Sequence, residues 1–246
     1  MEVIKCVIVG AVQGLTEFLP VSSSGHILIA QRLLGLECDA VTLSLALHLG
    51  TLAAVAAVYF KEFLRLFRPP FGRLGLLALA SLPAAAVGLA LGSSADALFG
   101  GGFLWAGFLL TAVLLFFAEK AMKKKYSGGI TAGRAAIMGL AQAAALVPGL
   151  SRSGATVSAG LLAKGDKAEV TTFSFLMSAP IIVGACAARF SGGAAAVSPL
   201  PLLAGFLSAA LFGFLAIRLF ARFVRANNFL PFRIYLIVAA VASIAL

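Results

Sequence analysis

The chain has 246 residues, of which 61% are hydrophobic and only 11% are charged. Soluble domains carry roughly 25% charged residues to cover their surface, so this composition excludes an ordinary soluble protein. The formal net charge of +10 comes without a glycine-rich nucleotide motif or an aromatic-interleaved basic patch, so no nucleic-acid partner is expected. The composition predicts an all-α polytopic membrane protein, in which basic residues gather in cytoplasmic loops.

The first apolar region, residues 3–34, is interrupted by a polar cluster. The stretch QGLTEFLPVSSSGH, residues 13–26, places a carboxylate, a proline, three serines, a glycine and a histidine close together. The apolar parts on either side are each shorter than the ~20 residues that cross a bilayer. We expect a re-entrant helix–loop–helix hairpin, because irregular backbone is tolerated at membrane depth where it is buried in protein or lines a wet cavity. A cleaved signal peptide is not expected, since no small-residue cleavage site follows the apolar run.

Further along the chain, apolar segments of about the length of a membrane span recur. They are residues 41–60, 74–91, 103–118, 172–188, 200–220 and 231–246. Another interrupted region, residues 133–163, is broken between Pro148 and Gly154 and again predicts a re-entrant hairpin. The chain is therefore expected to form a single integral membrane domain over residues 1–246, with about six transmembrane helices and two hairpins.

The loop charges test this topology. If each hairpin returns to its own side, most basic loop residues lie on one face: Lys61, Arg65, Arg68, Arg73, Lys120, Lys123, Lys124, Lys125, Arg134, Lys164, Lys167, Arg222 and Arg225. The opposite loops, residues 92–102 and 189–199, hold one basic residue between them, Arg189. Lys5 and Arg32 are the minor exceptions. The bias assigns the basic face to the cytoplasm.

The two interrupted regions resemble each other in sequence. Residues 10–35 read GAVQGLTEFLPVSSSGHILIAQRLLG, and residues 139–165 read GLAQAAALVPGLSRSGATVSAGLLAKG. Both contain Gly-x-x-Gln, an apolar stretch, a proline, a Ser-Gly pair, a helix and a glycine. Because the hairpins are expected to enter from opposite sides, the pattern predicts an inverted repeat with halves at about 1–118 and 119–246. The broken helices of such a repeat meet near the bilayer midplane.

Each loop carries serines immediately before a predicted helix. An N-cap explains one serine per loop, but it does not explain three in the first loop or Arg152 between two serines in the second. A helix N-terminus attracts anions, and an arginine binds phosphate oxygens in a bidentate manner. Two such termini facing each other predict a phosphate-binding site.

Glu17 and His26 are the other chemically active candidates in the first hairpin. Glu17 lies four residues after Gln13 and on the same helical face. A carboxylate at membrane depth indicates function, although a structural ion pair with Arg152 is the alternative. For His26 the alternative is an interhelical hydrogen bond. With Ser23, these residues supply a hydroxyl, a base and a cation, which phosphoryl transfer to or from a lipid-borne phosphate requires.

Several stretches together resemble the undecaprenyl-diphosphate phosphatase family of the bacitracin-resistance type. They are residues 13–26 (QGLTEFLPVSSSGH), 146–156 (LVPGLSRSGAT), 46–55 (ALHLGTLAAV), 173–180 (FSFLMSAP) and 231–235 (PFRIY). The resemblance covers essentially the whole chain. It implies hydrolysis of undecaprenyl diphosphate to undecaprenyl phosphate and inorganic phosphate in the bacterial inner membrane. This reaction recycles the lipid carrier of peptidoglycan synthesis and confers bacitracin resistance. Members are often dimeric and depend on a divalent cation, Mg²⁺ or Ca²⁺.

The resemblance also implies roles for individual residues. Ser23 matches a proposed nucleophile, Glu17 the essential second acid of the first motif, and His26 the essential histidine, as base or acid. Arg152 matches the arginine that holds the diphosphate. No metal ligand is assigned, and Glu17 is the one candidate. The candidate substrate-binding residues are Gln13, Ser22, Ser24, Gly25, Ser151, Ser153, Gly154 and Thr156.

The chain departs from the family pattern at two positions of the site. Gln13 stands where the first acid of the motif is expected, and Ser44 stands where an acidic residue usually precedes the histidine of HLG. Protein ligation of a metal is therefore weakened. Alternatives that the residues leave open are a polyprenyl-phosphate transporter or flippase and a phosphatase of broad lipid-phosphate specificity. The attacking group also stays open between Ser23, His26 and water.

Overall fold

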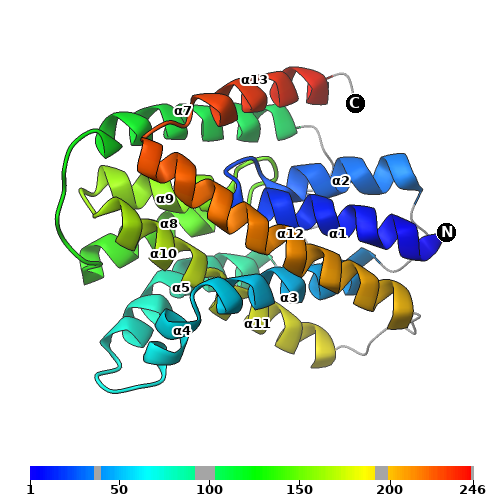
Figure 1. Ribbon diagram of the computed structural model, residues 1–246, viewed down its shortest axis with the longest axis horizontal. Helices are drawn as coiled ribbons and strands as arrows, with labels where there is room; N and C mark the ends of the chain where they lie inside the picture. The colour runs from blue at the N-terminus through cyan, green and yellow to red at the C-terminus, as the bar shows by residue number, and fades with distance from the viewer. Residues whose placement is uncertain (36–39, 92–102, 192–198, 245–246) are drawn as a thin grey trace.

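The computed structural model describes residues 1–35, 40–91, 103–191 and 199–244, and its ribbon is drawn in Figure 1. This part of the chain contains helices and no β-strand, which confirms the all-α prediction. The helices are α1 (Glu2–Phe18), α2 (Ser23–Leu34), α3 (Ala40–Val58), α4 (Phe60–Leu66), α5 (Gly72–Leu91), α7 (Leu104–Met122), α8 (Ala132–Ala144), α9 (Arg152–Leu162), α10 (Lys167–Leu176), α11 (Ser178–Ser191), α12 (Pro199–Ala226) and α13 (Leu230–Ile244).

Among the described residues, four continuous segments are long and apolar enough to cross a membrane. They are α5, α7, α12 and Lys167–Ala187, which joins α10 to α11. A fifth candidate is formed by α3 and α4 together, with a bend of 96° between them. The last predicted span corresponds to α13, an apolar helix of 15 residues. The polytopic prediction is thus confirmed, with a helix at each of the six predicted spans.

Several helices differ in extent from the predicted spans. The helix of the predicted span 41–60 ends at Val58, because the chain turns sharply into α4. Asp166 caps the N-terminus of α10 by accepting hydrogen bonds from two backbone N–H groups, so the helical region of span 172–188 begins at Lys167. Helix α12 extends beyond residue 220 to Ala226. The predicted span follows the apolar residues alone, whereas the helix continues through a stretch that includes Arg222 and Arg225.

Each interrupted region forms two helices whose outer ends lie next to each other. In the first, Lys5 of α1 donates a hydrogen bond of 2.9 Å to the carbonyl oxygen of Gly35, just after α2. In the second, the Arg134 guanidinium near the start of α8 donates to the carbonyl oxygens of Ala163 and Lys164, just after α9. Both regions therefore leave on the side from which they enter, as the predicted re-entrant hairpins require.

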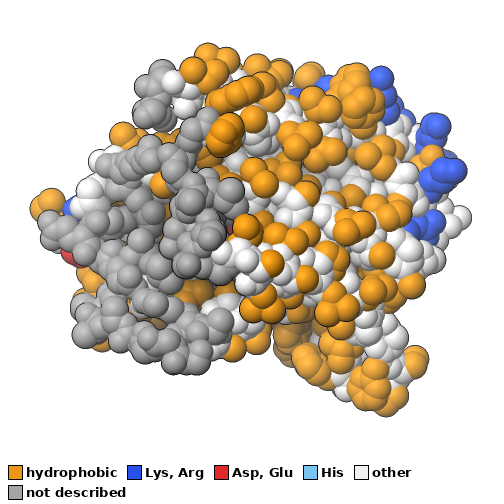
Figure 2. Space-filling model, turned by 180° about the vertical axis from the view of Figure 1, so that it is seen from behind, with side chains coloured by type: hydrophobic (Ala, Val, Ile, Leu, Met, Phe, Trp, Pro, Cys, Tyr) orange, Lys and Arg blue, Asp and Glu red, His pale blue; other side chains and the backbone are white. Residues whose placement is uncertain are grey.

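The two hairpins enter from opposite ends of the molecule and their loops meet near its middle (Figure 1). On the face drawn in Figure 2, lysine and arginine side chains gather at one end, and hydrophobic side chains are spread over the described surface next to it. The predicted loops 92–102 and 189–199 lie largely outside the described residues. The positive-inside rule places the basic end in the cytoplasm.

Small residues let α1 pack closely on α12. A Cβ atom at Gly10 would lie 2.5 Å from the carbonyl oxygen of Gly205, and one at Gly14 would lie 2.6 Å from that of Ala209. The hydroxyl of Ser208 on α12 also donates to the carbonyl oxygen of Val7 on α1. Close backbone approach of this kind stabilises helix pairs in membranes. It fixes the position of α1, which carries Glu17.

Helix α7 supports the loop of the second hairpin. A Cβ atom at Gly107 would lie 2.5 Å from the backbone carbon of Gly149, whose φ of +86° favours glycine. The Thr111 hydroxyl accepts a hydrogen bond of 3.0 Å from the backbone N–H of Ser151. These contacts hold the start of α9, and with it Arg152, at the junction between the hairpins.

Candidate functional site

The site is formed where the breaks of the two hairpins meet. Residues 19–22 separate α1 from α2, and residues 145–151 separate α8 from α9. Ser22 adopts a φ of +70°, a conformation that is uncommon for a residue with a side chain and that recurs at functional sites. Ser23 and Arg152 were expected in the loops that precede these helices, but α2 begins at Ser23 and α9 at Arg152, so that the two side chains belong to the first helical turns.

Glu17 is the centre of the site. Its side chain is buried, and its Oε2 accepts hydrogen bonds from Ser23 Oγ at 2.6 Å and from Gln13 Nε2 at 3.1 Å. Its Oε1 accepts a hydrogen bond from Arg152 Nη2, which forms an ion pair between the two hairpins. His48 Nε2 of α3 lies 3.9 Å from Oε2. A single carboxylate thus joins residues from α1, α2, α3 and α9.

The second loop presents donors that an anion can use. Ser151 is the N-cap of α9, because its Oγ accepts a hydrogen bond of 3.1 Å from Gly154 N. The Ser151 and Ser153 hydroxyls lie 3.2 Å apart, and Ser153 Oγ donates to the carbonyl oxygen of Leu19 in the first loop at 3.3 Å. Arg152 Nη1 is buried and has no hydrogen-bond partner within the described part of the chain. This unused donor at a helix N-terminus fits a phosphate oxygen.

Other predicted binding residues have structural contacts. The Ser22 and Ser24 hydroxyls lie 3.3 Å apart in the first loop. Gly25 packs against Phe108 of α7, where a Cβ atom would lie 2.8 Å from the ring. Gly154 faces Pro20 of the first loop, and a Cβ atom there would lie 3.3 Å from the Cβ of Pro20. The two glycines therefore allow the loops to approach their neighbours closely.

Thr156 is not brought together with Glu17. Its hydroxyl donates to the Arg152 carbonyl oxygen at 2.8 Å and lies 2.6 Å from Ser174 Oγ of α10. The side chain is fully buried. In this arrangement Thr156 ties α9 to α10 and holds the backbone of Arg152 in place.

His26 points toward α13. Its Nδ1 lies 2.7 Å from the Ser22 carbonyl oxygen and its Nε2 lies 2.5 Å from the Tyr235 hydroxyl. The His26 and Tyr235 rings are stacked with centroids 5.6 Å apart. Among the described residues, the hydrogen bonds of His26 involve these two groups and not Glu17 or Ser23. The geometry is that of the interhelical hydrogen bond which the sequence left as an alternative.

Sequence reasoning missed His48 and Tyr235 as members of the site. Both lie in stretches that support the family resemblance, ALHLG and PFRIY, but neither residue was assigned a role. His48 Nδ1 lies 2.7 Å from the Ser44 carbonyl oxygen, which leaves Nε2 directed toward Glu17. Polar side chains are energetically unfavourable inside a membrane, so a histidine or tyrosine in an apolar stretch could have been taken as a sign of a functional residue.

The residues at the junction do not fit a resident metal ion. No group of three His, Cys, Asp or Glu side chains that could hold a metal occurs in the described ranges. Glu17 is engaged through both carboxylate oxygens, and Gln13 contributes an amide where a second carboxylate would have been expected. Mg²⁺ usually binds through one or two carboxylates together with substrate phosphates and water. Here the carboxylate of Glu17 is already hydrogen-bonded to other side chains and is not free to bind the ion.

Comparison with known proteins finds relatives that cover nearly the whole chain. The family described as bacitracin resistance protein BacA matches residues 6–242. The undecaprenyl-diphosphatase of Rubrobacter xylanophilus is 41% identical, with 96% of this chain and 94% of the relative covered. Undecaprenyl-diphosphatase 4 of Bacillus thuringiensis subsp. konkukian is 38% identical, with 96% and 93% covered. The undecaprenyl-diphosphatase of Christiangramia forsetii is 35% identical, with 99% and 98% covered. The match extends over nearly the whole chain, and the protein therefore belongs to the bacitracin resistance protein BacA family.

Proposed function

We propose that the protein hydrolyses undecaprenyl diphosphate to undecaprenyl phosphate and inorganic phosphate, and so recycles the lipid carrier of peptidoglycan synthesis. The observation that carries the proposal is the convergence of Ser23 and Arg152, from opposite hairpins, on the Glu17 carboxylate. A nucleophile, a base and an anion-binding cation are then in one place among membrane helices. The names of the relatives support the substrate.

The diphosphate is proposed to lie between the N-termini of α2 and α9, with the polyprenyl chain among the spanning helices. Arg152 binds phosphate oxygens through Nη1 and, once Glu17 releases it, through Nη2. Ser151, Ser153 and the backbone N–H groups of the first turn of α9 complete the cradle. Binding is therefore coupled to the separation of the Glu17–Arg152 pair, which frees the carboxylate for chemistry.

In the chemical step, Ser23 Oγ is proposed to attack the terminal phosphorus atom while Glu17 accepts the hydroxyl proton. The bond between the terminal phosphorus and the bridging oxygen breaks, and undecaprenyl phosphate leaves with that oxygen. Water then releases phosphate from Ser23. Glu17 is favoured over His26 as the base because its Oε2 already lies 2.6 Å from Ser23 Oγ, whereas the His26 nitrogens lie next to Ser22 and Tyr235.

We also propose that Mg²⁺ or Ca²⁺ binds together with the diphosphate substrate. The residues of the junction do not fit an ion that the protein alone would hold. A homodimer is a further proposal, and light scattering of the purified protein in detergent tests it. Both proposals rest on the family resemblance.

The test is phosphate release from undecaprenyl diphosphate by the full-length protein in detergent, with and without Mg²⁺ or Ca²⁺. Ser23→Ala is expected to abolish release, and a covalent phosphoenzyme is expected in rapidly quenched wild-type samples supplied with labelled lipid. Ser243→Ala on α13, which removes a hydroxyl far along the chain from both hairpins, serves as the matched control. Normal turnover by Ser23→Ala would exclude the serine as nucleophile and favour direct attack by water. Retention of the lipid without any phosphate release by wild type would favour a polyprenyl-phosphate transporter.

A further inference from the structure

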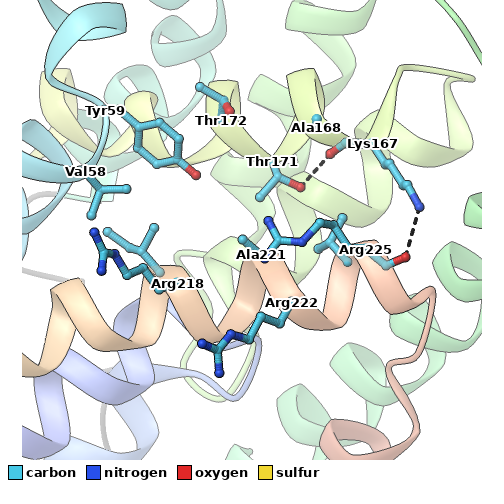
Figure 3. Close-up of a pocket in the computed structure, with 12 residues that line it drawn as sticks. Val58, Tyr59, Lys167, Ala168, Thr171, Thr172, Arg218, Ala221, Arg222 and Arg225 are labelled. Atoms are coloured by element: carbon cyan, nitrogen blue, oxygen red, sulfur yellow. Dashed lines mark hydrogen bonds between the residues drawn. The ribbon is translucent and has the colours of Figure 1, made fainter.

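A cavity lies at the basic end of the molecule, away from the junction of the hairpins. It has a volume of about 500 Å³ and lies between α12, α10 and the end of α3 (Figure 3). Its lining combines the basic residues Lys167, Arg218, Arg222 and Arg225 with hydroxyl groups such as that of Thr171. The lining contains no Asp or Glu. The cavity is therefore a concentrated positive site whose charge no lining carboxylate balances.

The arginines of α12 are available to a ligand. In the described part of the chain, no hydrogen bond or ion pair engages the guanidinium group of Arg218 or Arg225. Figure 3 shows both side chains on the side of α12 that faces α10. The Arg218 guanidinium lies over the Phe214 ring at 4.3 Å, which orients the group without using its N–H donors. Free, oriented guanidinium groups are suited to phosphate oxygens.

Lys167 forms the other side of the cavity. Its ammonium group donates hydrogen bonds of 2.8 Å to Asn227 Oδ1 and 3.3 Å to the Arg225 carbonyl oxygen. These bonds join the start of α10 to the end of α12, so that the two walls of the cavity are held at a fixed spacing. The charges therefore belong to a built pocket and not to independent surface side chains.

The cavity borders the exposed apolar surface of α12, where Leu215 and Leu211 precede Arg218 by about one and two helical turns. Val58, Ile217 and Val224 line the cavity, and the helical turns of α12 that precede Arg218 are apolar. The cavity thus lies at the boundary where the apolar surface meets the basic end. A soluble phosphate would use the charges alone, whereas a lipid would use both the charges and the apolar surface.

We propose that this cavity binds the phosphate headgroup of an anionic phospholipid from the leaflet at the basic end of the protein. The headgroup phosphate contacts Arg218 and Arg225, and the start of the acyl chains packs against Val58 and Leu215. The proposal does not depend on hydrolysis at the hairpin junction. Basic pockets between membrane helices on the cytoplasmic side are a recurrent form of lipid recognition.

The test uses the full-length protein in neutral detergent, titrated with dioctanoyl phosphatidylglycerol. Native mass spectrometry measures bound lipid, and thermal unfolding measures the stabilisation that binding produces. Dioctanoyl phosphatidylcholine and inorganic phosphate are the comparison ligands. Arg218→Gln/Arg225→Gln is the test variant. Lys124→Gln/Lys125→Gln, which removes the same charge from exposed positions at the same end, is the matched control.

Wild type and the lysine control are expected to bind phosphatidylglycerol alike, and the arginine variant about tenfold or more weakly. Ala221→Phe should also weaken binding, because it fills the cavity while leaving every charge in place. This variant provides the test if the double arginine variant does not fold. Equal weakening in the lysine control would overturn the proposal in favour of general charge attraction. Equal stabilisation by inorganic phosphate would overturn the lipid assignment in favour of a soluble anion.

Discussion

At the scale of single residues, the environment of Glu17 decides how the site works. A buried carboxylate is stable only when it is paired and hydrogen-bonded. Here Arg152 supplies the opposite charge, and Ser23 and Gln13 supply hydrogen bonds. The same contacts that stabilise the charge place a hydroxyl next to a base. The structural ion pair and the catalytic role, which the sequence presented as alternatives, are therefore compatible.

Glu17→Gln is expected to lower phosphate release by ~10²–10⁴-fold, the usual contribution of a positioned base. The substitution keeps the size of the side chain but removes the proton acceptor and the charge that pairs with Arg152. The turnover number, measured from the initial rate of phosphate release at saturating lipid, is the readout. Glu62→Gln, at a half-buried position of α4, should leave turnover unchanged. A Glu17→Gln protein that turns over normally would contradict the role of the carboxylate.

Tyr235→Phe is expected to lower the unfolding temperature measured in detergent, because it removes the hydrogen bond between α2 and α13, and to leave the turnover number unchanged. The substitution removes the hydroxyl that lies 2.5 Å from His26 Nε2 and retains the ring that stacks on the imidazole. Because the lost hydrogen bond is made to His26, combining the substitution with His26→Ala should add little to the loss of stability caused by His26→Ala alone. Additive losses in this double-mutant cycle would show that the two residues act independently. Tyr126→Phe, in the segment between α7 and α8, is the control.

At the scale of helices, the close contact between α1 and α12 determines where Glu17 lies. Gly14→Val would place side-chain atoms where the Ala209 carbonyl oxygen now lies, so α1 must move away from α12. We expect a lower unfolding temperature together with reduced phosphate release. Gly88→Val on α5 is the matched control, because a Cβ atom there meets no described atom within 4 Å. Equal effects of the two substitutions would argue against specific packing at Gly14.

The helical elements differ in how far the sequence alone predicts them. The hairpins follow from two properties that are local in sequence, the short apolar lengths and the polar breaks. The repeat predicted in addition that Glu17 and Arg152 would share one site. The contact between His26 and Tyr235 was beyond prediction because the two residues are 209 positions apart and no repeat relates them. The 96° turn before α4 was also missed, since the apolar pattern runs through Tyr59 and Phe60 without a proline or glycine.

At the scale of the whole molecule, the re-entrant hairpins predict that the two ends of each hairpin lie on the same side of the membrane. Single cysteines are introduced at Glu2 and Leu33, which flank the first hairpin, and at Lys125 and Ala168, which flank the second, after the native cysteines are replaced by alanine. In intact cells, a membrane-impermeant thiol reagent should label the first pair and should reach the second pair only after permeabilisation. Opposite labelling within either pair would show that the hairpin crosses the membrane.

The ion pair between the two hairpins has a consequence for selectivity among lipids. An anion entering the junction competes with Glu17 for Arg152. In the absence of substrate, the carboxylate therefore takes the place of the anion on the guanidinium. A lipid with a single negative charge offers the guanidinium no more than Glu17 already offers. A diphosphate carries more charge and more acceptor oxygens, and can therefore displace it. The enzyme would in this way ignore the abundant singly charged lipids around it, and would release its own monophosphate product as the carboxylate returns.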